Sequence, residues 1–411
     1  MRPREVRELV QLRRPRRRRV DRVLARSVTI ADLRAEACRR WPAGVRGYVE
    51  GGADAEITLA HNRAAFDAYR FVPSVLRDVE KIDPSTEILD VRSALPVALG
   101  PTGYTRMMHP DGEIAASRAA RDAGIPYTLS TMSTCSIEDV AERTGGGDRW
   151  FQLYAWRDRH LVRELLERAG TAGYRALVLT VDTAVTGLRV RDHHNGFTLP
   201  PRLTPGTLLD MARHPAWCLG LLRGEPITFA NFGRDVSGRS ENIMQFAARQ
   251  FDPSVSWGDL DWLRQHWSGP IVLKGLLDVR DALRARDLGV DAIALSNHGG
   301  RQLDQTVSPL QVLPAVRAAV GPAYPLLLDS GVRRGTDLAI ALALGANACL
   351  LGRAYLYGLG AAGEPGCAAA IRMIGDELRR AMQLLGVLDI AQLRERGADL
   401  VRRVESERMG T

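Results

Sequence analysis

The stretch VDAIALSNHGGRQLD, residues 290–304, decides the fold and carries the densest set of reactive side chains. Its first part, Asp291 to Leu295, is a short apolar run of the kind found in strands buried on both faces. His298 and Arg301 follow at its end, and the two glycines between them let the backbone approach a ligand. A base beside a fixed cation suits an anionic substrate. The alternative is a strand end with a purely structural histidine.

The same pattern of an apolar run, a polar end and a helical stretch occurs eight times from about residue 95. The eight predicted strands are residues 95–103, 125–131, 150–155, 176–183, 270–275, 292–300, 325–335 and 348–354. Helical patterns lie between most of them, as in 112–123, 161–172, 279–287 and 337–344. This repetition predicts an α/β fold, a closed (β/α)8 TIM barrel, with the active site where the strands end.

The remaining segments are expected to serve the barrel, which takes residues 95–390. Residues 27–94 predict an N-terminal helical segment packed on it, and residues 391–411 a C-terminal tail. Within the first of these, residues 29–40 predict a helix that Ser27 or Thr29 caps and Trp41 ends.

The formal charge of +8 belongs to one short segment. Residues 1–26 hold eleven arginines and three acidic residues, so they account for the whole of it. We therefore expect a basic, disordered tail rather than a nucleic-acid-binding protein, with contact to anionic lipid as the alternative.

A long insertion follows the fourth strand, at about residues 195–255, and is expected to cover the barrel mouth. Its middle, residues 207–224, is apolar enough for a buried helix, which is the default interpretation. The alternative is that Trp217 and its neighbouring leucines rest on a membrane surface.

The five cysteines are widely spaced and include no C-x-x-C pair, which favours reduced thiols over a disulfide or metal framework. No apolar run approaches the length of a bilayer span, and the arginine-rich start lacks the apolar stretch of a secretory signal. We expect a cytoplasmic protein, with peripheral contact to the inner face of the cell membrane as a variant of that expectation.

The polar residues at the strand ends divide into two groups. Glycines beside arginines, in LDSGVRRG and LLGR after the last two strands, suit a phosphate group. The other strands offer hydroxyls, an amide, a carboxylate, a histidine and Lys274, a set that could surround a flat heteroaromatic ring and a small anion. Asp182 is the expected partner of His298. Lys274 could neutralise a reduced cofactor or form a Schiff base.

These motifs together carry a resemblance. SNHGGRQLD with LTVDT, FQLY, VLKG, LDSGVRRGTD and LLGR, in this order, resembles the FMN-dependent L-2-hydroxy acid dehydrogenase and oxidase family, over about residues 29–390. The resemblance implies FMN as cofactor and oxidation of a small L-2-hydroxy acid, foremost L-lactate, to the 2-oxo acid. It also implies a homotetramer, and transfer of the electrons to a quinone, oxygen or another acceptor.

The resemblance also implies roles for individual residues. His298 would be the base, Asp182 its partner, and Tyr154 the contact to the substrate hydroxyl. Tyr48, Arg189 and Arg301 would hold the substrate carboxylate. The implied FMN contacts are Pro101, Thr102, Gly103, Ser130, Gln152, Thr180, Lys274 and Ser296 at the ring, and Asp329, Gly331, Arg333, Gly352 and Arg353 toward the phosphate.

Some residues depart from the family pattern. Ala184 replaces a proline that often follows LTVDT, and Met132 stands where glycolate oxidase has a tryptophan, so the pocket for the substrate side chain differs. The position of Gly103 is held by alanine in several oxidases and by glycine in the lactate and mandelate dehydrogenases, so the glycine here favours a dehydrogenase.

Three alternatives stay open at this point. The first is an oxygen-using oxidase or monooxygenase of the glycolate or mandelate type. The second is a Schiff-base aldolase built on Lys274. The third is a non-catalytic flavoprotein or membrane-docking module.

Overall fold

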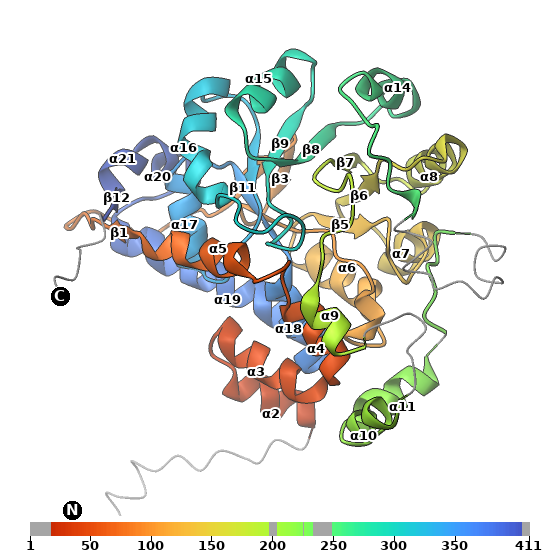
Figure 1. The fold of residues 1–411 in the computed structure, drawn as a ribbon. Helices are drawn as coiled ribbons and strands as arrows, with labels where there is room; N and C mark the ends of the chain where they lie inside the picture. The colour runs from red at the N-terminus through yellow and green to blue at the C-terminus, as the bar shows by residue number, and fades with distance from the viewer. Residues whose placement is uncertain (1–17, 197–203, 225, 233–248, 405–411) are drawn as a thin grey trace, which may run out of the picture.

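The computed structural model describes residues 18–196, 204–224, 226–232 and 249–404. Eight parallel strands close into a barrel surrounded by helices (Figure 1). In chain order they are β4 (Val97–Leu99), β5 (Tyr127–Ser130), β6 (Arg149–Tyr154), β7 (Ala176–Thr180), β8 (Ile271–Leu276), β9 (Ala292–Leu295), β10 (Leu326–Leu328) and β11 (Ala348–Leu351). Each overlaps one predicted range, so the (β/α)8 TIM barrel is confirmed.

The barrel interior is a separate apolar core of mostly small side chains, among them Ala98, Ala176, Ala292 and Ala348. Small residues fit there because an eight-stranded barrel leaves little internal space. A hairpin of β2 (Thr86–Ile88) and β3 (Val91–Ser93) supplies Ile88 and Leu89 to the same core. Because these side chains fill the barrel interior, the expected place for a functional site is at the carboxyl ends of the strands.

The outer layer consists of helices, most of them amphipathic. They are α6 (Gly112–Asp122), α7 (Ile137–Thr144), α8 (Arg159–Thr171), α14 (Asp259–His266), α15 (Val279–Asp287), α16 (Pro309–Val320), α17 (Gly335–Ala343), α18 (Arg353–Ala362) and α19 (Glu364–Leu385). Of these, α17 and α18 are buried almost throughout. In α8 the buried residues Val162, Leu165, Leu166 and Ala169 recur at helical spacing, and Asp158 accepts hydrogen bonds from the first-turn N–H groups.

At the N-terminus the structure differs from the predicted tail. Residues 19–26 form helix α2 (Arg19–Arg26), which packs against α3 (Ile30–Arg40), α18 and α19. Val20, Val23 and Leu24 give it an apolar face, and Val23 is buried. Arginines alternate with these apolar residues in the sequence, so the segment was predicted as a basic tail and not as a helix. Residues 1–17 of the predicted tail lie outside the described residues.

The next helices agree with the prediction. A capping box joins Thr29 to Asp32 at the start of α3, which ends before Trp41. Helices α4 (Ala43–Glu50) and α5 (Ile57–Asp67) follow.

Residues 391–404 of the predicted C-terminal tail form regular structure, and residues 405–411 lie outside the described residues. Helices α20 (Ile390–Glu395) and α21 (Gly397–Leu400) lead into β12 (Val401–Arg403), which pairs antiparallel with β1 (Tyr69–Phe71). Leu393, Leu400 and Val401 are buried, so these elements belong to the core.

The insertion after β7 contains α9 (Val190–His194) and two helices, α10 (Pro205–Ala212) and α11 (Pro215–Arg223), that project from the body (Figure 1). The expectation of one buried helix over 207–224 is wrong, because Pro215 starts a second helix and neither helix has a buried residue. Trp217 ties α11 to the short helix η1 (Thr105–Met107), since its Nε1 donates to the Met107 carbonyl at 2.7 Å.

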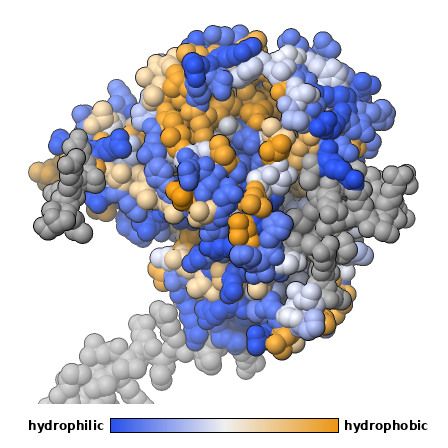
Figure 2. Space-filling model, viewed as in Figure 1, coloured by the Kyte–Doolittle hydropathy of each residue, from blue (hydrophilic) through white to orange (hydrophobic). Residues whose placement is uncertain are grey.

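Apolar side chains lie on the outside of this projection, as Figure 2 shows at its lower right. Leu222 is 81% exposed and Leu208 51%, with Leu209 and Leu219 also exposed. Within the described ranges, no helix combines the length and apolar character needed to cross a bilayer.

Candidate active site

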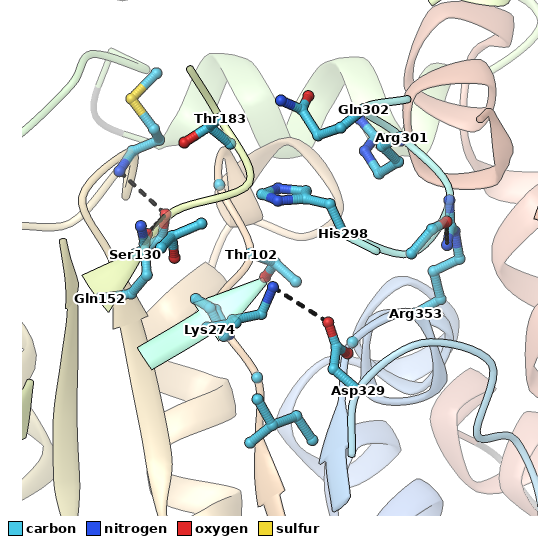
Figure 3. A pocket seen from close by; sticks show the side chains of 18 of the residues that line it. Thr102, Ser130, Gln152, Thr183, Lys274, His298, Arg301, Gln302, Asp329 and Arg353 are labelled. Carbon is cyan, nitrogen blue, oxygen red and sulfur yellow. Dashed lines mark hydrogen bonds and ion pairs between the residues drawn. The ribbon is translucent and has the colours of Figure 1, made fainter. Parts of the chain in front are cut away.

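A polar cavity, here called the main cavity, opens at the carboxyl ends of the barrel strands (Figure 3). The alternation of strand side chains explains its lining. Along β7, Ala176 and Val178 face the barrel core, and the next inward position is Thr180; along β8, Val272 is followed by Lys274. The last inward position of each strand therefore reaches the cavity.

Nearly all the predicted site residues meet there. Those lining the cavity are Tyr48, Pro101, Thr102, Gly103, Ser130, Gln152, Tyr154, Thr180, Arg189, Lys274, His298, Arg301, Asp329, Gly331, Arg333, Gly352 and Arg353. The exceptions are Asp182 and Ser296, which lie behind His298 and Lys274 and hydrogen-bond to them.

His298 is held in one orientation. Its φ of 58° lies in the left-handed region, and its N–H donates to Ser296 Oγ at 3.0 Å. The Nδ1 atom is 2.8 Å from Asp182 Oδ1. Since a carboxylate can only accept, Nδ1 is the protonated nitrogen of the neutral ring, and in that tautomer the lone pair is on Nε2.

Asp182 is suited to stabilise a protonated imidazole. Burial alone would raise the pKa of its carboxyl, but the neighbouring His298 and Lys274 hold that pKa below its ordinary value. Its Oδ2 is buried with no hydrogen-bond partner among the described residues. Asp182 therefore stays charged at neutral pH.

Lys274 also stays charged. Its Nζ lies 3.2 Å from Asp329 Oδ2 (Figure 3). It also donates to Ser296 Oγ at 3.0 Å. Burial lowers the pKa of Lys274, but Asp329 and Asp182 outweigh it and raise the pKa above its usual value. A Schiff base needs a neutral amine, so this environment does not favour the aldolase alternative.

Two arginines and a tyrosine form a site for a carboxylate. Arg301 Nη1 donates to the carbonyls of Tyr48 and Gly51, while Nη2 is buried and has no partner within the described part of the chain. The guanidinium carbons of Arg301 and Arg189 lie 4.7 and 5.9 Å from the Tyr48 ring centre. Burial, together with Arg189, lowers the pKa of Arg301. An anion bound here would offset the repulsion between the two guanidinium groups and accept a hydrogen bond from Arg301 Nη2.

The opposite side of the main cavity fits the ring of FMN. Ser130 Oγ and the Thr131 N–H donate to Gln152 Oε1, at 3.1 and 3.2 Å, which fixes the amide. Gln152 Nε2 and Thr180 Oγ1 are then buried without a partner among the described residues. Unmatched buried polar atoms are costly, and the polar edge of the FMN ring would satisfy them.

The phosphate end fits in part. Gly352 caps α18, whose N-terminal N–H groups favour an anion, and Arg333 and Gly331 line the same region. Arg353, however, donates to the carbonyls of Val49, Gly51 and Gly299. It therefore also joins α4 to the loop after β9. Burial and its arginine neighbours lower the pKa of Arg353 to about 10.

Several other residues that line the main cavity were not predicted to belong to the site. Tyr104 and Phe251 form aromatic walls, in edge contact with Tyr48 and Tyr154 at 5.6 and 5.2 Å. Gln302 donates to the Asp182 and Val185 carbonyls and steadies the loop after β7. Gln302 could have been predicted as a site residue, because it lies in the SNHGGRQLD motif. Phe251 could not, because the insertion that contains it has no regular sequence pattern.

Comparisons with known proteins agree with this geometry. A family model described as FMN-dependent dehydrogenase matches residues 37–400. The L-lactate dehydrogenase of Caulobacter vibrioides is 44% identical over 367 residues, which is 89% of this chain and 95% of that protein. The crystal structure of the monotopic membrane protein (S)-mandelate dehydrogenase is 41% identical, with a TM-score of 0.88 over 92% of this chain and 100% of that one. A mandelate oxidase structure is 36% identical, with a TM-score of 0.78 over 92% and 100%.

Proposed function

The chain belongs to the FMN-dependent dehydrogenase family, whose cofactor is FMN, and we propose that it oxidises a small L-2-hydroxy acid, foremost L-lactate, to the 2-oxo acid. The observation that carries the proposal is the His298–Asp182 pair, set beside the Arg301 and Arg189 guanidinium groups at the mouth of the main cavity.

Each residue of the site has a role in this reaction. Arg301 and Arg189 bind the substrate carboxylate and fix one orientation of the α-carbon, which gives selectivity for the L-isomer. Burial raises the pKa of Tyr154, so its hydroxyl stays protonated and contacts the substrate hydroxyl as a donor. His298 Nε2 accepts the proton that leaves the substrate, and Asp182 stabilises the resulting cation.

The bound cofactor would supply the electron acceptance. That chemistry is the uptake of the electron pair that leaves the α-carbon. Gln152, Thr180 and Ser130 would hold the FMN ring, with Ser296 behind Lys274. The Lys274 ammonium would place a positive charge where negative charge develops on reduction. Pro101, Thr102 and Gly103 would complete the ring contacts, and Asp329, Gly331, Arg333, Gly352 and Arg353 would make those toward the phosphate.

The cavity walls support a small substrate side chain. Tyr104 and Met132 are buried, and Phe251 packs against Tyr154 on the other side. Bulky side chains on both sides favour a compact substrate side chain, such as the methyl group of lactate, over a phenyl group. Mandelate is nevertheless the second candidate, because the structural neighbours named above are mandelate enzymes.

An anaerobic screen of L-lactate, glycolate and (S)-mandelate tests the substrate. We expect L-lactate to bleach the FMN absorbance fastest and D-lactate to leave it unchanged. Faster bleaching by (S)-mandelate would transfer the proposal to the second candidate. No bleaching by any of these acids would refute both.

We also propose that α10 and α11 rest on the inner face of the cell membrane. The leucines on their outer surface lie beside the exposed Arg213 and Arg223, which suit anionic lipid. Leu219→Asp and Leu222→Asp should reduce co-sedimentation with phosphatidylglycerol vesicles, whereas Leu288→Asp, at an exposed leucine after α15, should not. Equal binding of all three variants would contradict this surface. The homotetramer stays a prediction that sedimentation equilibrium can test.

A further inference from the structure

A second cavity lies against the first and has a different chemistry. We call it the side cavity; it is bounded by the ends of β6, β7 and β8 and by the segment that leads into α14. Its lining residues are Ala155, Leu179, Thr180, Val181, Thr183, Ala184, Asp252, Pro253, Val255, Ser256, Trp257, Asp259, Leu260 and Leu273. Thr180 and Thr183 line both cavities, so a single layer of residues separates them.

The lining excludes the substrate anion. No lining residue of the side cavity is Lys, Arg or His, and it contains two carboxylates. Asp259 pairs with Arg159 at 2.7 Å, outside this lining, and Asp252 accepts from Ser254 Oγ at 2.6 Å. The carboxylate of a 2-hydroxy acid would lose its hydration here and find no positively charged side chain in the lining.

The same lining suits a neutral, flat and largely apolar molecule. Leu179, Leu260 and Leu273 are buried and form an apolar floor, and Val255 lies nearby. Trp257 lies in the wall, and the Arg284 guanidinium covers one face of its indole, 5.1 Å from the ring centre. The cavity opens to solvent, because Val181 in its lining is 38% exposed and Ala184 is exposed as well.

We propose that the side cavity binds a quinone, which reoxidises the cofactor. This inference rests on the proposed function, because that reaction leaves two electrons on FMN. The substrate's two electrons and one of its two protons leave on the reduced cofactor, and the other proton leaves on His298. The quinone takes up both electrons and both protons to become the quinol, and oxidised FMN and neutral His298 are regenerated. The two described cavities adjoin at Thr180 and Thr183, so the electrons would pass beside these residues. Tyr48, Arg189 and Arg301 do not line the side cavity, so the quinone and the carboxylate would occupy different places.

The first test measures binding directly and needs no turnover. The oxidised holoenzyme is irradiated with an azido derivative of ubiquinone, and the labelled peptides are identified by mass spectrometry. We expect the label on residues 252–260, and we expect an excess of ubiquinone-1 but not of L-lactate to prevent it. Labelling confined to other segments would overturn the proposal.

The second test fills the cavity. Val255→Trp should slow reoxidation of the substrate-reduced enzyme by ubiquinone-1 about tenfold relative to reoxidation by ferricyanide, which reacts at the surface. Val255→Ala controls for loss of the valine, and Leu288→Trp controls for an added indole elsewhere; both should keep the wild-type ratio. An unchanged ratio in Val255→Trp would overturn the site. Failure of every 2-hydroxy acid to reduce FMN would instead refute the proposed function, and the labelling result would still report on the cavity.

Discussion

The role of Asp182 leads to a prediction whose size follows from the geometry. Its Oδ1 lies 2.8 Å from His298 Nδ1, and the carboxylate is held in its charged form. Asp182→Asn keeps the shape and one accepting oxygen but removes the negative charge that stabilises the imidazolium as His298 takes the proton.

The expected loss can be estimated from the strength of that contact. A hydrogen bond to a charged group contributes about 1.5–3 kcal/mol. Because about 1.4 kcal/mol corresponds to a tenfold change in rate, FMN reduction should slow by about 10- to 150-fold. The KM for substrate should change little, since Arg301 and Arg189 are untouched.

The assay is anaerobic stopped-flow reduction of FMN by L-lactate at saturating concentration. Asp304→Asn is a matched control, because Asp304 is a buried carboxylate of the loop that carries His298, and it accepts from the N–H groups of Ile57 and Thr58. It should keep the reduction rate within about twofold of wild type. A wild-type rate in Asp182→Asn, or an equal loss in both variants, would refute the charge-stabilisation argument.

Three further predictions concern stability. Although burial alone would raise it, the pKa of Asp329 is held below 3.8 by the neighbouring lysine ammonium. The Lys274–Asp329 ion pair therefore stabilises the fold above about pH 4, and this stabilisation is lost as the pH falls further. The melting temperature of Asp329→Asn should therefore depend less on pH in that acidic range than that of the wild type. Gly103→Ala would bring a Cβ to 3.0 Å from Met132 Cβ and should lower the free energy of unfolding by about 1 kcal/mol, measured in urea. Deleting residues 1–26 removes α2 and should cost about 1–2 kcal/mol in the same assay, whereas deleting residues 1–17 should leave the described packing unchanged.

The barrel could be predicted because each strand has a local signature. An apolar run with a polar end, such as Ala176–Asp182, reflects burial on both faces followed by the cavity rim. The elements outside the barrel lack such a signature. The apolar face of α2 is interleaved with arginines, and the apolar stretch 207–224 contains Pro215, which splits it into two exposed helices. Composition alone could not decide whether that stretch packs inward.

The sequence predicted which residues gather at the candidate site. It did not predict which of them line the cavity and which lie behind its wall. Convergence at the strand ends follows from the barrel itself, so His298, Lys274 and Arg301 meet as expected. Strand position does not tell which residues touch the cavity and which stand behind it. Ser296 is the example, since it bridges Lys274 and Asp329 by hydrogen bonds. The walls of the side cavity come partly from the insertion and partly from outward strand positions, and the sequence did not indicate them.

The central claim is that His298 takes the proton that leaves the substrate in a site that binds FMN independently of it. His298→Gln tests it most directly, by comparing the FMN content of the purified variant with its anaerobic reduction by L-lactate. We predict a protein that keeps its full yellow FMN absorbance and is reduced about 100- to 10,000-fold more slowly than wild type. Bleaching at the wild-type rate would show that another group takes the proton and would contradict the account.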